Sequence, residues 1–136
     1  MLTAVPACTP SSHTLEPYRD DPVRAAGLEV RAAQQCNHLP PNDFTTDGCS
    51  SWPDNGWVTC CVEHDMAYWC GGSSAERQNA DAEFRACIAR DHGTGWATAM
   101  YWGVRAGGSA WWPLPWRWGY GWPWPEGYSD DVGDSP

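Results

Sequence analysis

The sequence contains no lysine, no long apolar run and no Cys-x-x-Cys pair, and each absence excludes a class of protein. All 8 basic residues are arginine, against 17 acidic residues, and the formal net charge is -9. Such an acidic chain has no electrostatic reason to bind nucleic acid or anionic lipid headgroups, whereas acidity suits the binding of a cation. Without a run of about 18 apolar residues, no transmembrane helix is expected. Without Cys-x-x-Cys, the usual zinc spacings are missing.

The sequence also lacks any segment in which apolar and polar residues alternate over the length of a β-strand. We therefore expect a mostly α fold, small and disulfide-braced, with long loops. Helices are predicted in four stretches: 22–39, 58–69, 74–90 and 94–106. Asp21 and the capping box that begins at Ser73 mark two of the helix starts, and Gly71-Gly72 separates the second helix from the third.

Each predicted helix has an apolar face that should be buried. In the first helix this face is Val23, Ala26, Val30 and Ala33. In the third it is Ala80, Phe84, Cys87 and Ile88, and in the fourth it is Trp96, Met100 and Val104. We also expect Trp102 in the core.

Three segments differ in composition within a length that suits one domain. Residues 1–20 are predicted to be a flexible leader, and 21–110 a helical domain. Residues 111–136 form a tail rich in Trp and Pro, for which we predict extended, polyproline-like structure with a disordered end. We expect Trp116, Trp118, Trp122 and Trp124 to lie partly at a rim that faces lipid or a partner.

The chain has 7 cysteines, which indicates disulfides and therefore a secreted or extracytoplasmic protein. An odd count leaves one cysteine without an internal partner, and Cys8 is the outlier in the sequence. Val5-Pro6-Ala7-Cys8 is similar to a bacterial lipoprotein cleavage site, although the preceding residues are too few for a signal peptide. Two interpretations of Cys8 stay open: a lipid anchor or a free thiol.

Two of the predicted helices carry residues that suit hydrolytic chemistry. Cys60, His64 and Tyr68 are spaced by four and line one helix face. The short Gly-Gly connection favours antiparallel packing of the next helix, which carries Asp81 and Cys87. If Cys60 bonds Cys87, His64 lies about 6 Å from the crosslink along its helix and Asp81 about 9 Å along the other. The carboxylate could then accept one imidazole N–H and leave the other ring nitrogen as a base.

Asp65 follows His64 directly, so its side chain points about 100° away around the helix. It cannot orient the histidine well, but a carboxylate in this place could hold a hard cation such as calcium. The loop 47–52 could add backbone carbonyls, and a Cys49–Cys61 bridge would fix that loop beside Asp65. Cys60, Cys61 and His64 could instead bind zinc, but adjacent cysteines chelate one ion poorly.

These residues resemble the secreted phospholipase A2 superfamily. The family signature is two cysteines, two further residues, His-Asp, and a Tyr three positions later, and residues 60–68 match it. Its second helix has an Asp six positions before a Cys, as in Asp81 and Cys87. The resemblance covers residues 47–90, about a third of the chain.

The resemblance implies a role for each matching residue. His64 would take a proton from water, Asp81 would hold the tautomer of His64, and Tyr68 would donate a hydrogen bond to Asp81. Asp65 would bind Ca²⁺ together with backbone carbonyls near three loop residues, Gly48, Ser50 and Trp52.

The chain departs from the family pattern at two places. The usual loop reads Cys-Gly-x-Gly-Gly, whereas Cys49 is followed here by Ser-Ser-Trp-Pro. Alanines occupy Ala67 and Ala80, where the family often has a further cysteine pair. Cys36 and Cys70 could then pair with each other, although the sequence does not fix this third pairing.

The function implied by the resemblance is calcium-dependent hydrolysis of the sn-2 acyl ester of glycerophospholipids, by a monomer acting at a membrane or micelle interface. Two other interpretations stay open. One is a non-catalytic phospholipase A2-like protein whose Trp-rich face binds a membrane or a partner. The other is a carbohydrate or cell-wall binder that uses the Trp-rich tail, with the helical pair as a scaffold.

Overall fold

A computed structural model describes residues 20–49 and 56–129 of the chain. In these residues the protein is mostly helical, with no β-strand, as expected. The helices are α1 (Pro22–Gln35), α2 (Val58–Cys70), α3 (Ser74–His92) and α4 (Thr94–Gly107). The predicted flexible leader, the two interpretations of Cys8 and the predicted disordered end concern residues that lie outside the described ranges.

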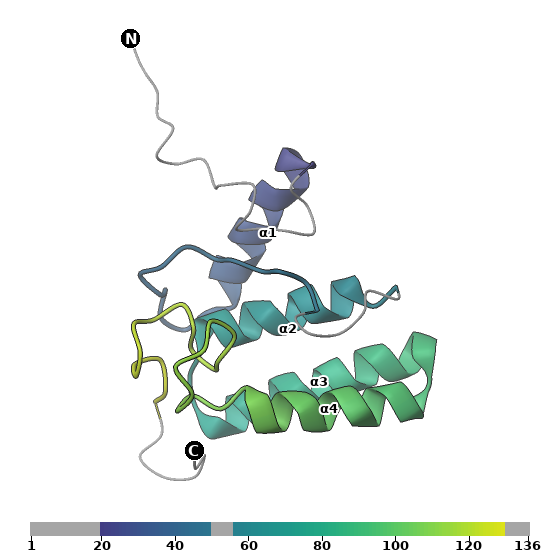
Figure 1. Cartoon of the computed structure of the whole chain (residues 1–136). Helices are drawn as coiled ribbons and strands as arrows, with labels where there is room; N and C mark the ends of the chain where they lie inside the picture. The colour runs from purple at the N-terminus through teal and green to yellow at the C-terminus, as the bar shows by residue number, and fades with distance from the viewer. Residues whose placement is uncertain (1–19, 50–55, 130–136) are drawn as a thin grey trace.

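Helices α2, α3 and α4 lie side by side, and each runs opposite to the one before it (Figure 1). Helix α1 packs on α2, while the segment after α4 folds back over the end where α2 stops and α3 starts (Figure 1). In the described ranges, none of the helices combines the length and the apolar character needed to cross a membrane.

Local sequence signals explain where the helices begin and end. The Asp21 side chain accepts a hydrogen bond from Arg24 N, with Pro22 in the first turn. Ser73 and Glu76 form the predicted capping box at the start of α3. Gly71 ends α2 at a φ of 71°, a conformation that glycine adopts without the cost a side chain would add.

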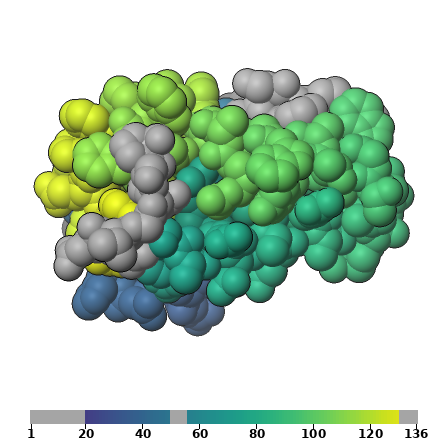
Figure 2. Space-filling model, turned by 90° about the horizontal axis from the view of Figure 1, so that it is seen from below, coloured from purple at the N-terminus to yellow at the C-terminus, as the bar shows by residue number. Residues whose placement is uncertain are grey.

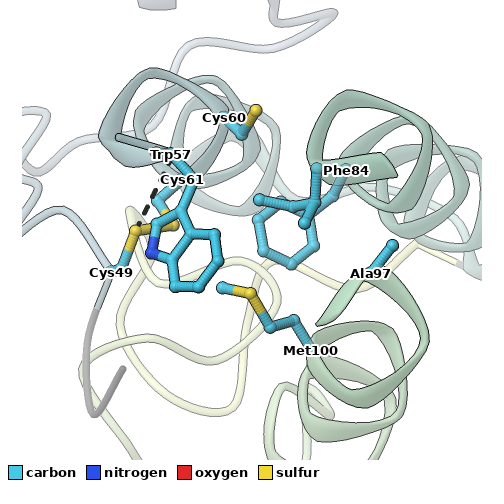
Figure 3. Packing of buried hydrophobic residues seen from close by; sticks show 8 residues of the cluster. Cys49, Trp57, Cys60, Cys61, Phe84, Ala97 and Met100 are labelled. Carbon is cyan, nitrogen blue, oxygen red and sulfur yellow. Dashed lines mark hydrogen bonds between the residues drawn. A yellow bond between two sulfur atoms is a disulfide. The ribbon is translucent and has the colours of Figure 1, made fainter. Parts of the chain in front are cut away.

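Two aromatic rings lie at the centre of the core between α2, α3 and α4. Phe84 of α3 and Trp57, which precedes α2, pack with Met100 and Ala97 of α4 (Figure 3). A second cluster, around Met66 and Trp69 of α2, buries one face of α1. The core therefore fixes the spacing of α2 and α3, the two helices that carry the candidate site.

Three disulfides brace this core, and all three predicted pairs are confirmed: Cys36–Cys70, Cys49–Cys61 and Cys60–Cys87. They join α1 to the end of α2, the loop before α2 to its first turn, and α2 to α3. Such bonds are compatible with an extracytoplasmic protein, because reducing compartments keep thiols free.

The predicted buried face of α1 is wrong. The buried residues are Ala25, Leu28 and Ala32, whereas Val23 and Val30 are exposed. Both sets follow a helical period, so the pattern alone did not distinguish them. The side chains that contact α2 are those on the strip with the larger Leu28.

Several predictions about tryptophans are also wrong. Trp96 and Trp102 of α4 are 45% and 62% exposed rather than in the core. Trp118 was predicted at a rim, yet it is 1% exposed, and its indole N–H donates to Gly72 O. Trp116 and Trp124 are exposed as predicted, and Trp122 is half-buried. Helix α4 has only one buried strip, which Ala97 and Met100 occupy.

The Trp/Pro-rich tail folds into successive turns rather than the predicted extended structure. The buried guanidinium of Arg117 organises these turns, because it donates to the carbonyl oxygens of Trp118, Trp122 and Glu126. Gly119 and Gly127 pack backbone to backbone, so a side chain on either would clash. One buried cation therefore replaces the regular backbone hydrogen bonds that proline excludes.

Replacing Arg117 by Met should lower the free energy of unfolding by about 3 kcal/mol, because one buried and two partly buried hydrogen bonds to carbonyls would lose their donor. Urea unfolding followed by tryptophan fluorescence measures this change. Arg90→Met on the exposed surface of α3 is the matched control and should change the free energy by less than about 0.5 kcal/mol. Equal small effects in both variants would contradict the proposed role of Arg117.

Candidate functional site

The structure brings His64 of α2 and Asp81 of α3 into direct contact. Nε2 of His64 lies 2.7 Å from Oδ1 of Asp81. His64 is 8% exposed and Asp81 is fully buried. Since an ionised carboxylate can only accept, this contact places the ring proton on Nε2 and leaves a lone pair on Nδ1.

Two aromatic side chains fix the orientation of the imidazole. The ring centroids of Tyr68 and Phe84 lie 4.3 Å and 4.5 Å from that of His64. The Tyr68 hydroxyl also donates to Oδ1 of Asp81 at 2.7 Å. Tyr68 thus contacts both members of the pair, in agreement with the four-residue spacing from His64.

Two arginines that no sequence motif indicates complete the surroundings of Asp81. Arg105 of α4 donates from Nη1 to Oδ2 of Asp81 at 2.7 Å. Arg77 of α3 donates from Nε to the Tyr68 hydroxyl at 3.0 Å, and its Nε lies 3.9 Å from Oδ2 of Asp81. Arg77 precedes Asp81 by four residues on the buried strip of α3, and this signal could have identified it. Arg105 comes from a distant segment, and no spacing pointed to it.

The charge state of Asp81 follows from these partners. Burial alone raises the pKa of its carboxyl, and it is the largest single influence. The hydrogen bonds from His64, Tyr68 and Arg105 act the other way and together bring the pKa below its ordinary value. Asp81 is therefore an anion at neutral pH, held by donors on both oxygens.

A cavity of about 240 Å³ opens beside His64. Its lining includes Gly48, Asp65, Tyr68 and Phe84, together with Gly103, Val104, Gly107 and Gly108 of the α4 end and Trp116 of the tail. No described residue bonds Nδ1 of His64, and every fully buried side-chain nitrogen or oxygen of the described residues has a partner. Nδ1 is thus accessible to a molecule in the site.

Asp65 lies on the same cavity as His64, as predicted. Thr46 donates to Oδ2 of Asp65 at 2.6 Å and accepts from Gly48 N at 3.1 Å. Burial raises the pKa of the Asp65 carboxyl well above its usual range, and the nearby negative charge of Asp47 adds to this shift. A bound cation would offset both effects, since it would stabilise the carboxylate.

The remaining predicted calcium ligands are placed only in part. Gly48 lines the cavity with Asp65, whereas Ser50 and Trp52 lie outside the described residues. Across residues 20–49 and 56–129, no three His, Cys, Asp or Glu side chains are grouped so as to hold a metal ion. The donors at this end of the cavity are oxygens, which suits a hard cation, and backbone carbonyls would have to complete its coordination.

Exposed tryptophans lie near the cavity. Trp116 is part of the cavity wall, and the Trp112 indole donates to Ala106 O at the end of α4. Trp102 is on the turn of α4 that contains the wall residue Gly103. The tail and α4 are neighbours on one face of the molecule (Figure 2). Aromatic side chains with a polar N–H favour the boundary between water and an apolar phase.

Comparison with protein family models, curated proteins and solved structures finds no match to this chain.

Proposed function

We propose that this protein hydrolyses the sn-2 acyl ester of glycerophospholipids, with calcium bound at Asp65 and His64 as the general base. The observation that carries the proposal is the 2.7 Å contact between His64 Nε2 and Asp81 Oδ1 beside a cavity that Asp65 and Gly48 also line. An oriented imidazole alone is common, but an oriented imidazole beside a buried carboxylate that could hold a cation suits ester hydrolysis.

The proton balance follows from the tautomer of His64. Nδ1 takes a proton from a water molecule in the cavity while Nε2–H stays bonded to Asp81. The water oxygen bonds to the ester carbonyl carbon and forms a tetrahedral intermediate. When the ester C–O bond breaks, Nδ1–H returns its proton to the leaving lysophospholipid oxygen. His64 ends the cycle neutral, with the released fatty acid and the lysophospholipid as products.

The calcium ion would be held by the Asp65 carboxylate with carbonyls near Gly48, Ser50 and Trp52, and would supply positive charge to the developing oxyanion. Residues of this chain hold two of these proposed ligand groups in position. Thr46 fixes the Asp65 carboxylate and the backbone of Gly48 through one hydroxyl group. Asp65 and His64 line the same cavity, so a cation held by Asp65 and the base would both be beside a bound ester.

The cavity wall also suits an acyl ester. Phe84 and Val104 are apolar, and Gly103 and Gly107 carry no side chains to obstruct an alkyl chain, while Gly108 lies against the Tyr68 ring. A side chain on Gly107 would meet no atom within 4 Å, so open space adjoins the helix there. A ligand with a polar reacting group and an apolar tail fits such a site.

The exposed tryptophans favour a second candidate, a phospholipase A2-like protein that binds a membrane or a partner without turnover. Trp102, Trp112 and Trp116 are each at least 40% exposed. Both functions would use this face, so vesicle binding alone does not distinguish them. In the carbohydrate-binding interpretation, Trp118 is buried and unavailable to a ligand, which leaves only the exposed tryptophans of the described tail to contact it.

The deciding experiment incubates the full chain with phosphatidylcholine vesicles, with calcium or with a chelator. We expect fatty-acid release in calcium and a loss of at least about 10²-fold in the chelator, the usual effect of removing one group that stabilises the oxyanion. Co-sedimentation with the same vesicles is measured in parallel. Binding without release in either condition would replace the hydrolase with the binding protein, and release that ignores the chelator would remove calcium from the mechanism.

A further inference from the structure

We propose that Arg105 is a positioning residue, which holds the Asp81 carboxylate so that its other oxygen orients His64. The inference rests on the proposed function for its catalytic meaning, although the positioning itself is a property of the fold. Neither the helical spacing of α2 and α3 nor the motif around His64 requires an arginine at the end of α4.

The contacts of Asp81 divide between its two oxygens. Oδ1 accepts from His64 Nε2 and from the Tyr68 hydroxyl, each at 2.7 Å. Oδ2 accepts from Arg105 Nη1, also at 2.7 Å. The carboxylate is 0% exposed, so with Arg105 in place its oxygens are held by protein donors rather than by solvent. With Arg105 in place, rotation of the carboxyl group would break a charge-assisted bond, and Oδ1 stays toward His64.

Arg77 fixes the backbone from which Arg105 extends. Its Nη2 donates to the carbonyl oxygens of Val104 and Arg105, at 3.0 Å and 2.7 Å, in the last turn of α4. Val104 O also accepts from the C-cap N–H of Gly108, whereas Arg105 O is among the last carbonyls of the helix, which have no intrahelical donor. The end of α4 is thereby tied to α3, which carries Asp81, and the Arg105 side chain has a fixed origin.

The positive charge of Arg105 explains why a neutral donor to Oδ2 would hold the Asp81 carboxylate less well. Burial disfavours the ionised form of Asp81, and a protonated carboxyl could donate as well as accept. It would then no longer specify the Nε2–H tautomer of His64. Arg105 supplies the opposite charge at Oδ2 with one N–H···O bond. Because only one bond is used, the single ammonium group of a lysine can replace it.

The test compares Arg105→Gln and Arg105→Lys with the unchanged chain. For Arg105→Gln we expect kcat for fatty-acid release to fall by about 10²-fold with KM within about two-fold, since a displaced base affects the transition state rather than binding. Arg105→Lys should keep at least about a third of kcat. In an Asp81→Asn background, Arg105→Gln should cause no further loss, because Arg105 acts through Asp81.

A proton NMR measurement separates this inference from the proposed function. The buried N–H of His64 should give a far-downfield signal, assigned by its loss in His64→Gln. The signal should persist in Arg105→Lys and disappear in Arg105→Gln, whether or not the protein turns over a phospholipid. Its persistence in Arg105→Gln, or its loss from a folded Arg105→Lys, would overturn the inference. If Arg105→Gln does not fold, Arg105→Lys decides by the same criterion.

Arg85→Gln is the matched control. Arg85 of α3 donates to Thr98 of α4 on the exposed side of the same helix pair, and its side chain is exposed although it follows Phe84 directly. The substitution therefore removes an arginine that links α3 to α4 but does not contact Asp81. A loss of kcat or of the His64 signal in Arg85→Gln equal to that in Arg105→Gln would show a general helix-packing effect and would contradict the proposal.

Discussion

His64→Gln should reduce fatty-acid release by about 10⁴-fold, since it removes the base that accepts the proton of water. Gln keeps an N–H donor within reach of Asp81, so the buried carboxylate retains a partner and the fold persists. The expected loss is in kcat, with KM little changed, because the imidazole contacts the attacking water rather than the lipid. Initial rates with phosphatidylcholine vesicles in calcium measure it.

His38→Gln is the matched control, because His38 is exposed and lies outside the cavity. It should keep the parent rate within about two-fold. Circular dichroism and the melting temperature establish that both variants are folded. A folded His64→Gln that retains more than a tenth of the parent rate would contradict the assignment of His64 as the base.

Much of the fold could be predicted from short-range sequence signals. The caps at Asp21 and Ser73 and the glycine end of α2 each depend on residues within one helical turn. The contact of His64 with Asp81 was also predictable, because two antiparallel helices and one crosslink leave little freedom in their register. Short-range helix geometry was therefore enough to predict the contact between His64 and Asp81, but not the other residues around them.

The parts that were not predicted depend on contacts between distant segments. Arg105 reaches Asp81 across 24 residues of sequence, and its role follows from how α4 packs rather than from any motif. The tail was expected to be extended because proline excludes helix and strand, yet Arg117 supplies donors that allow compact turns. The tryptophans of α4 were misplaced because a helix that packs on one side leaves its other large apolar residues exposed.

Asp65→Asn should abolish the calcium response. In the parent, calcium at about 100-fold above its Kd should raise the free energy of unfolding by about 2.7 kcal/mol, which corresponds to a melting temperature roughly 10 °C higher. Asp65→Asn should show no shift, because it lacks the only described carboxylate on the wall of the cavity. Fatty-acid release should fall by about 10³-fold. Thermal melts with calcium and with a chelator measure the first effect.

The melting temperature in chelator tests the Asp65 carboxylate without a bound cation. Burial raises the folded pKa of Asp65, so its contribution to stability is present below the ordinary pKa and is lost as the pH rises through the folded value. At neutral pH without a cation, burial of this carboxyl is therefore less favourable to the folded state than it is in acid. Asn is neutral and can still accept the hydrogen bond from Thr46. Asp65→Asn in chelator should then melt no lower than the parent, while the control Asp91→Asn, on an exposed turn of α3, should follow the parent in both conditions. A calcium shift that survives in Asp65→Asn would place the cation elsewhere.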